Sequence, residues 1–208
     1  KDFSINLSTK TTIAGNYTLK LTATGSGIYS RTGTALTTDA SDSWKVDLTA
    51  PTVLVSSSET SPTNASPIPI TIEFSEPVSG FEISDITTGN ATASNFNTVN
   101  DSTFTVDLTP SSNGNVTVDI IAGVCIDIAG NDNVVASQFA ITYDNIAPTL
   151  SSVQIASNNS NPTYAKIDDI VKVTFTGSEE LQDKPSVTIA GHAINSSYIT
   201  NTSGNKWE

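Results

Sequence analysis

A six-residue motif occurs twice in this chain, and it constrains the fold more than any other feature. It reads Asp47-Leu-Thr-Ala-Pro51-Thr and then Asp144-Asn-Ile-Ala-Pro148-Thr, so the two prolines are 97 residues apart (148 minus 51). Each copy follows one alternating apolar segment and precedes another. Because proline fixes φ and pushes the preceding residue to an extended conformation, each motif predicts a semi-rigid joint between two domains.

Apolar residues alternate with polar ones along the whole chain, and a period of two predicts half-buried strands. Between the joints, residues 48–145 carry seven such segments, at Val53 and Val55, Ile70 to Phe74, Phe81 and Ile83, Ala91 to Phe96, Phe104 to Leu108, Val116 to Ile120, and Phe139 to Tyr143. Turn sequences such as Pro110-Ser-Ser-Asn-Gly114 separate them. This number and spacing of strands is typical of one complete Ig-like β-sandwich.

The segments outside the joints repeat parts of this pattern. Residues 1–47 predict the last three strands of a sandwich, at Phe3, Ile5 and Leu7, at Tyr17, Leu19 and Leu21, and at Trp44 and Val46. Residues 146–208 predict the first strands of a further one, with Trp207 in the position that Phe104 has in the middle domain. A sheet without its facing sheet exposes an apolar face. We therefore expect further residues of the chain, or a neighbouring chain, to complete each partial domain.

The charge distribution narrows the choice of partners. The chain has 21 acidic and 9 basic residues, for a net charge of −12, and no Lys, Arg or His lies between Leu48 and Ala147. Such an acidic chain is not expected to bind nucleic acid or an anionic membrane surface. No apolar run reaches the length of a transmembrane helix, so no membrane insertion is expected in this segment.

The residue types needed for catalysis are sparse. His192 is the only histidine, and no Ser-His-Asp or zinc-ligand spacing includes it. Cys125 is the only cysteine and stands in an apolar run without a local cation that would lower its pKa, so we expect a buried, unreactive thiol. The sequence therefore predicts that the chain is not an enzyme.

Four segments of the middle domain, in their order along the chain, carry a family resemblance. They are Phe74-Ser-Glu-Pro-Val-Ser-Gly-Phe81, Ser84-Asp-Ile86, Ala122-Gly-Val-Cys-Ile-Asp-Ile-Ala-Gly-Asn131 and Tyr143-Asp-Asn-Ile-Ala-Pro148. They resemble the bacterial Ig-like repeats of large surface proteins and adhesins. The resemblance implies an all-β rod of tandem Ig-like domains outside a microbial cell, here partial (1–47), complete (48–145) and partial (146–208), with calcium often held in loops and at joints.

The end of residues 1–47 resembles the same family with one departure. Ala14-Gly-Asn-Tyr-Thr-Leu-Lys-Leu-Thr-Ala23 looks like the end of a related repeat, but Tyr29-Ser-Arg-Thr-Gly33-Thr34 stands where the family usually has Asp-x-Ala-Gly-Asn. Ser30 thus occupies the acidic position. A metal site in that loop is not expected.

At the first joint, the order of strands in an Ig sandwich brings several oxygen ligands together. The loop that begins at Asp127, the turn that carries Glu76 and the segment that contains Asp47 all lie at one end of the sandwich, with Asn131 or Asp132 as further ligands. Hard oxygen anions without a local cation suit Ca²⁺, which accepts six to eight oxygens. The alternative is that these are solvated acids and that Asp127 only forms an Asx-turn.

The same logic applies to the second joint. It predicts Asp144, Glu179 and Glu180 as candidate ligands there, although the equivalent of Asp127 in the third domain does not fall within these 208 residues. The alternative is again a set of solvated acids.

Two functions from different classes fit these observations. The first is a structural stalk or extender of a secreted adhesin, filament or surface layer, stiffened by Ca²⁺ at its joints and contacting Ig-like domains of the same or an adjacent chain. The second is a module that binds a surface glycan or a host or cell protein, or that accompanies a secreted enzyme. A groove lined by exposed Trp and Tyr would favour the second, but the middle domain has no Trp and only Tyr143.

Overall fold

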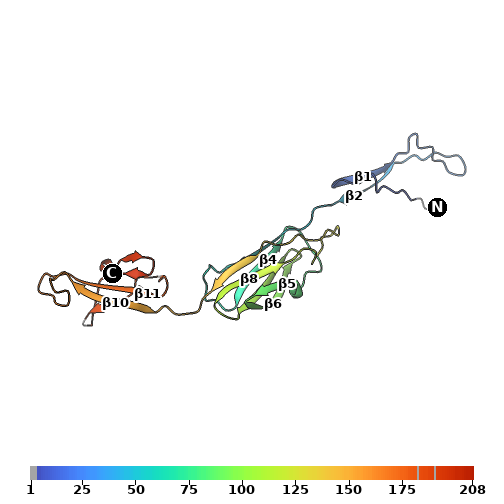
Figure 1. The fold of residues 1–208 in the computed structure, drawn as a ribbon. Helices are drawn as coiled ribbons and strands as arrows, with labels where there is room; N and C mark the ends of the chain where they lie inside the picture. The colour runs from blue at the N-terminus through green and yellow to red at the C-terminus, as the bar shows by residue number, and fades with distance from the viewer. Residues whose placement is uncertain (1–3, 182, 190) are drawn as a thin grey trace. The chain divides into compact units, whose positions relative to one another are not determined.

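The computed structural model describes residues 4–181, 183–189 and 191–208. All its regular elements are antiparallel strands and two short 3₁₀ turns (Figure 1). The predicted all-β class is therefore confirmed. The chain divides into two compact units, residues 1–145 and 146–208. Within the described residues, no helix has the length and apolar character needed to cross a membrane.

The N-terminal part of the first unit contains one β-hairpin. Strand β1 (Gly15–Leu21) pairs with β2 (Ala40–Val46), and the ring of Tyr17 stacks on Trp44 with centroids 5.7 Å apart. The third strand predicted here is wrong: residues 5–7 form no strand, and Phe3 lies outside the described residues. A strand needs a neighbouring edge for its N–H and C=O groups. Strands β1 and β2 provide this edge for each other, and no described strand does so for residues 5–7.

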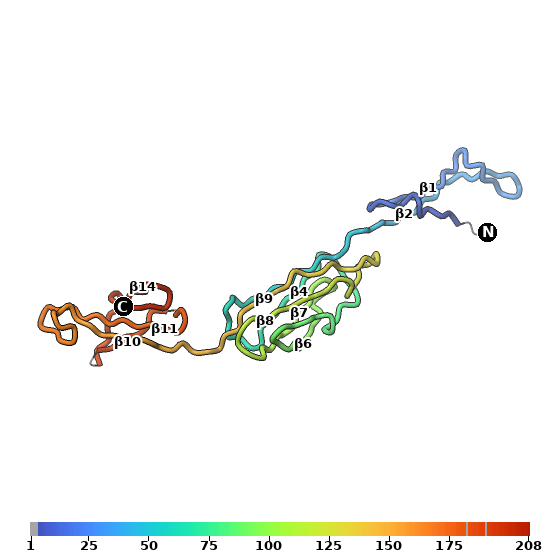
Figure 2. The backbone as a smooth tube through the Cα atoms, in the orientation of Figure 1, coloured from blue at the N-terminus to red at the C-terminus, as the bar shows by residue number. Residues whose placement is uncertain are grey.

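Residues 53–143 form a sandwich of two sheets (Figures 1 and 2). The first sheet has the order β3 (Val53–Ser57), β4 (Ile68–Phe74), β7 (Thr103–Pro110), β6 (Ala91–Asn100). The second has the order β5 (Ile86–Gly89), β8 (Gly114–Ile120), β9 (Phe139–Tyr143). The seven strands agree with the sequence prediction in number.

The core of this sandwich follows from the period-two pattern. In β4 the side chains of Ile68, Ile70, Ile72 and Phe74 point inward and are buried, and Val116, Val118 and Ile120 do the same from β8. Since successive residues of a strand face opposite sides, each strand contributes every second side chain to one continuous core. Cys125 is buried in this core, as predicted, and its burial raises the pKa of the thiol to about 11.

One strand of the sandwich begins later than predicted. Phe81 is buried, but Ile83–Asp85 forms a 3₁₀ turn and β5 starts only at Ile86. The carboxylate Oδ2 of Asp85 accepts a hydrogen bond from the backbone N–H of Glu82 at 2.8 Å, and the Asp85 N–H donates to the Glu82 carbonyl at 3.1 Å. These local bonds compete with sheet pairing.

The second unit has one four-stranded sheet and a small hairpin. Its sheet order is β10 (Leu150–Ser157), β11 (Val171–Gly177), β15 (Lys206–Trp207), β14 (Asn201–Ser203). The hairpin pairs β12 (Thr188–Ile189) with β13 (His192–Ala193), and a second 3₁₀ turn covers Ser196–Tyr198. Phe175, Ile199 and Trp207 form its small buried cluster.

Candidate functional site

The first joint, by which we mean residues 47–52, is fixed to the sandwich by backbone hydrogen bonds. Thr52 N–H donates to the Ser75 hydroxyl at 3.0 Å, and Ser75 N–H donates back to the Thr52 carbonyl at 2.9 Å. The carbonyl of the buried Pro51 accepts from Val134 N–H at 2.9 Å. The chain therefore enters β3 without slack.

The loop that begins at Asp127 is folded around its own carboxylate. Oδ1 of Asp127 accepts from the N–H groups of Ala129 and Asn131, both at 2.8 Å, and Oδ2 accepts from Nδ2 of Asn131 at 2.8 Å. Gly130 adopts φ +90°, which a residue with a side chain adopts only with strain. The bond from Asn131, followed by those from the loop's backbone N–H groups, holds the pKa of this buried carboxyl below its ordinary value.

Asn131 connects this loop to the first joint. Its Nδ2 lies 3.2 Å from the carbonyl oxygen of Asp47 and 3.4 Å from that of Thr49, in addition to its bond to Asp127. Residues 84 positions apart in the sequence are thus held by one amide group. The Asn131 amide has two N–H hydrogens but three oxygen acceptors within hydrogen-bonding distance. Its nitrogen therefore lies where these three oxygens converge.

The loop from Ser30 shows that this turn does not require a carboxylate. Ser30 Oγ accepts from Thr32 N–H at 3.2 Å and from Thr34 N–H at 3.1 Å, the same i+2 and i+4 donors that bind Asp127 Oδ1. Backbone bonds close both loops in the same way, from Ser30 N–H to the Thr34 carbonyl and from Asp127 N–H to the Asn131 carbonyl. The hydrogen-bonded turn is therefore a property of the loop and is independent of its charge.

Asp47 has a cationic partner that the sequence analysis did not consider. Nζ of Lys45 lies 2.5 Å from Oδ2 of Asp47, and Oδ1 accepts from Thr49 N–H at 3.1 Å. The bond with Lys45 lowers the pKa of Asp47, and the same bond raises the pKa of Lys45. The carboxylates of Glu76 and Asp127 add smaller attractions to Lys45. The prediction that these acids lack a local cation is therefore wrong for the first joint.

The other ligands predicted for this joint are arranged less closely. Glu76 is half-buried directly after Ser75, within electrostatic range of Lys45. Asp132 is exposed and its backbone forms an isolated bridge with Ile126. The structure thus brings the Asp127 carboxylate and the backbone carbonyl of Asp47 together on the Asn131 amide, with Glu76 nearby.

The second joint repeats one hydrogen-bonded device of the first. Thr149 N–H donates to the Ser178 hydroxyl at 2.9 Å, and Ser178 N–H donates to the Thr149 carbonyl at 2.8 Å, as Thr52 and Ser75 do. Glu179 follows Ser178 in the second unit, as Glu76 follows Ser75. Asp144 belongs to the first unit, where its N–H donates to the Thr63 carbonyl at 2.8 Å.

The described side chains do not form a ready-made metal site. In residues 4–181, 183–189 and 191–208, no three His, Cys, Asp or Glu side chains meet in an arrangement that would hold a metal ion. At the first joint, hydrogen-bond donors satisfy the oxygens of Asp127, and Lys45 binds Asp47. Calcium would fit here only in place of the Lys45 ammonium and the Asn131 amide nitrogen.

Two residues that organise this end of the sandwich were missed by sequence reasoning. Lys45 stands two positions before Asp47, and a period of two places both side chains on the same side of an extended chain. The ion pair between them could therefore have been predicted from the sequence. Asn133 is buried, and its Oδ1 accepts from the N–H groups of Val124 and Cys125 at 2.9 and 3.1 Å. Only the fold reveals that these backbone groups need a partner.

Comparison with known proteins agrees with this architecture. Residues 47–143 match the family model described as bacterial Ig-like domain. The search of curated proteins found no match, and the search of solved structures found none either. The matched range begins at Asp47 in the first joint and ends with β9.

Proposed function

Residues 47–143 belong to the bacterial Ig-like domains, which are usually found in surface or secreted proteins, and from this premise we propose that the chain is a non-enzymatic spacer in such a protein. Its task in this proposal is to set distance and direction along a stalk outside the cell. A spacer needs domains that fold as units and joints that limit bending. The hydrogen bonds of the first joint support the second requirement.

The observation that supports the proposal most directly is the set of hydrogen bonds from the Asn131 side chain to the first joint. One side-chain amide joins the Asp127 carboxylate to the carbonyls of Asp47 and Thr49. A free linker would leave these carbonyls to water, and each bond made instead restricts the linker backbone. The loop between the strands thus acts as a clasp on the chain that leads into the domain.

Replacing Asn131 tests this role. Asn131→Ala removes the clasp. The distribution of distances between spin labels on β2 and β8, measured by pulsed electron paramagnetic resonance, should therefore become broader. Asp132→Ala is the matched control, because Asp132 is an exposed neighbour in the same loop. Equal distributions for wild type and Asn131→Ala would refute the clasp.

Stiffening by Ca²⁺ is the finer part of the proposal. Oδ2 of Asp127 and the carbonyls of Asp47 and Thr49 already surround the Asn131 amide nitrogen. These oxygens, with the Asp47 carboxylate, are the groups that would hold the ion, and Ca²⁺ would supply positive charge to them. Lys45 competes for the same negative charge, so the proposal requires weak binding that removal of Lys45 strengthens.

Titration calorimetry with calcium chloride separates this from a joint that only forms hydrogen bonds. Lys45→Gln should bind Ca²⁺ several-fold more tightly than wild type, and Asp127→Asn should bind it less tightly. Lys20→Gln is the control, since Lys20 pairs with Asp39 and carries the same charge on the other strand of the hairpin. Absence of binding in the Lys45→Gln variant would refute the calcium proposal and leave the spacer proposal intact.

A further inference from the structure

One contact of the middle sandwich differs in direction from its strand pairs. The strands of both sheets pair antiparallel, but Thr63, in the segment between β3 and β4, forms a parallel bridge with Tyr143 at the end of β9. Thr63 N–H donates to the Thr142 carbonyl at 2.9 Å, and Asp144 N–H donates to the Thr63 carbonyl at 2.8 Å. The bridge thus lies where the chain leaves the sandwich.

Further hydrogen bonds fix the segment around Thr63. Ser61 Oγ accepts from Thr142 N–H at 3.0 Å, so both backbone groups of Thr142 are bound to this segment. Thr63 itself is buried, and its Oγ1 accepts from Ala65 N–H at 3.1 Å and donates to Oε2 of Glu59 at 3.3 Å. We call the three hydrogen bonds between residues 61–63 and 142–144 the exit bridge.

The chain enters and leaves the sandwich at opposite ends of β9. At the first joint, the Pro51 carbonyl accepts from Val134 N–H, just before β9 begins. At the other end of β9, Thr63 is bound to Thr142 and Asp144. The chain from Pro51 to Thr63 therefore runs from one end of β9 to the other, in the same direction as β9 itself.

This arrangement determines how tension loads the exit bridge. A pull on the first joint reaches Thr63 through β3, and a pull on the second joint acts directly on Asp144, so the two sides of the bridge are drawn in opposite directions along β9. Hydrogen bonds between strands lie across the strand direction. The pull therefore shears the bonds of the bridge together, whereas strands separated from one end lose their bonds one after another.

We propose that the exit bridge is a tension-bearing clamp, which keeps the middle sandwich folded when a pull acts through its two joints. The inference rests on the proposed spacer function, because a spacer in a surface protein transmits any pull along its chain. Resistance to force is governed by the rate of unfolding. The bonds that must break before β9 can leave the sandwich set this rate, and the exit bridge is the first of them on the path from the second joint.

Single-molecule force spectroscopy tests the clamp on the 208-residue chain, held at its two ends so that tension passes through both joints. Unfolding of residues 53–143 releases about 300 Å of chain, which identifies the event. Thr63→Pro removes the N–H that donates to Thr142, and its middle sandwich should unfold at least about tenfold faster at a fixed force. Thr63→Val is the matched control, because it loses the hydroxyl but keeps the backbone bonds, and its rate should stay within a few-fold of wild type.

A core variant separates a clamp from a general loss of stability. Val118→Ala removes buried methyl groups and leaves the exit bridge intact. Both Val118→Ala and Thr63→Pro should lower the midpoint of chemical denaturation. For the same loss of stability in denaturant, Thr63→Pro should speed forced unfolding more than Val118→Ala, because only Thr63 lies on the path of the load.

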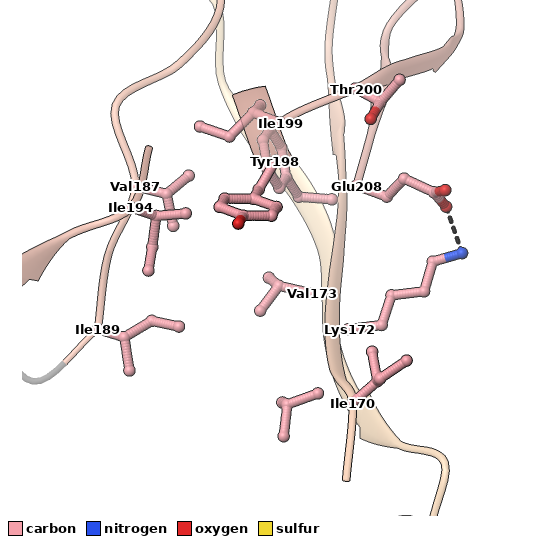
Figure 3. A pocket seen from close by; sticks show the side chains of 12 residues that line it. Ile170, Lys172, Val173, Val187, Ile189, Ile194, Tyr198, Ile199, Thr200 and Glu208 are labelled. Atoms are coloured by element: carbon pink, nitrogen blue, oxygen red, sulfur yellow. Dashed lines mark ion pairs between the residues drawn. The ribbon is translucent and has the colours of Figure 1, made fainter. Parts of the chain in front are cut away.

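The second unit serves as an internal reference in the same recordings. Its described strand pairs are all antiparallel. Figure 3 shows the ion pair between Lys172 of β11 and Glu208, beside an apolar groove of about 430 Å³. None of these contacts involves the exit bridge, so unfolding of residues 146–208 should be the same in wild type and Thr63→Pro.

Should Thr63→Pro fail to fold, Ser61→Ala replaces it, because it removes only the acceptor of the Thr142 N–H and should also speed forced unfolding, by a smaller factor. A bridge variant that unfolds at the wild-type rate under force would overturn the clamp. So would a bridge variant and Val118→Ala with equal effects for the same loss of stability. Either result leaves the spacer proposal standing, since that proposal is judged by the distance distributions of Asn131→Ala.

Discussion

The first sheet of the middle sandwich and the sheet of the second unit have the same strand order but differ in burial. Ile68 begins β4 and is fully buried, while Val171, its counterpart at the start of β11, is 49% exposed. Each position is paired with one neighbouring strand, Ile68 with Leu108 of β7 and Val171 with Ser157 of β10. The comparison shows that pairing makes the sheet, whereas the facing sheet makes the core.

The largest expected effect is a difference in stability between alanine variants at these two positions. Ile68→Ala should lower the free energy of unfolding of the middle sandwich by about 2–5 kcal/mol, because it removes buried methyl groups and leaves a cavity. Val171→Ala should change the stability of the second unit by less than about 0.5 kcal/mol at concentrations where the chain is monomeric. Denaturant-dependent hydrogen exchange of β4 and β11 amides measures both, and equal losses would contradict the difference in burial.

A second prediction concerns the buried Asn133 side chain of the complete sandwich. Asn133→Ala leaves the buried N–H of Cys125 and the part-buried N–H of Val124 without their acceptor, at a cost of about 1–3 kcal/mol for a buried group. Chemical denaturation of the variant should therefore show a lower midpoint with an unchanged slope. A wild-type midpoint would mean that water replaces the lost acceptor. Asn97→Ala, at an exposed position of β6, is the control.

The two joints, unlike the two sheets, should respond alike to the loss of a serine hydroxyl. Ser75→Ala and Ser178→Ala each remove the hydroxyl that accepts from Thr52 or Thr149 N–H. Each change should lower the stability of its own unit by about 0.5–1.5 kcal/mol, since the bond is local and independent of the facing sheet. Hydrogen exchange of the Thr52 and Thr149 amides measures the two losses, and a loss in only one unit would show that the joints differ.

The smallest expected effect is a pH dependence of the first joint. Hydrogen bonds, first of all from Asn131, lower the folded-state pKa of Asp127 from its ordinary value of 3.8. A lowered folded pKa stabilises the protein above the unfolded pKa, and this contribution is lost as pH falls through the folded value. The stability difference between wild type and Asp127→Asn should therefore shrink below about pH 4 in thermal melts. A constant difference from pH 7 to pH 2 would exclude the linkage.

The sequence by itself determined where most strands lie and which side chains face inward. Alternation placed β4, β7, β8 and β9, and the spacing of the repeat placed Trp207 at the position of Phe104. These features depend on local patterning, because the side chains of a strand alternate whatever the strand pairs with. The division into 1–47, 48–145 and 146–208 and the calcium ligands stay predictions.

The tertiary structure decided which patterned segments become strands and which acids meet. Ile5 and Leu7 alternate like β7 but form no strand, because no described edge pairs with them, and the Asp85 carboxylate delays the start of β5. Asn131 reaches the first joint only because the strands bring residues 84 positions apart together. Hydrogen-bond partners that distant in sequence are set by the packing of the sheets, and no local pattern records them.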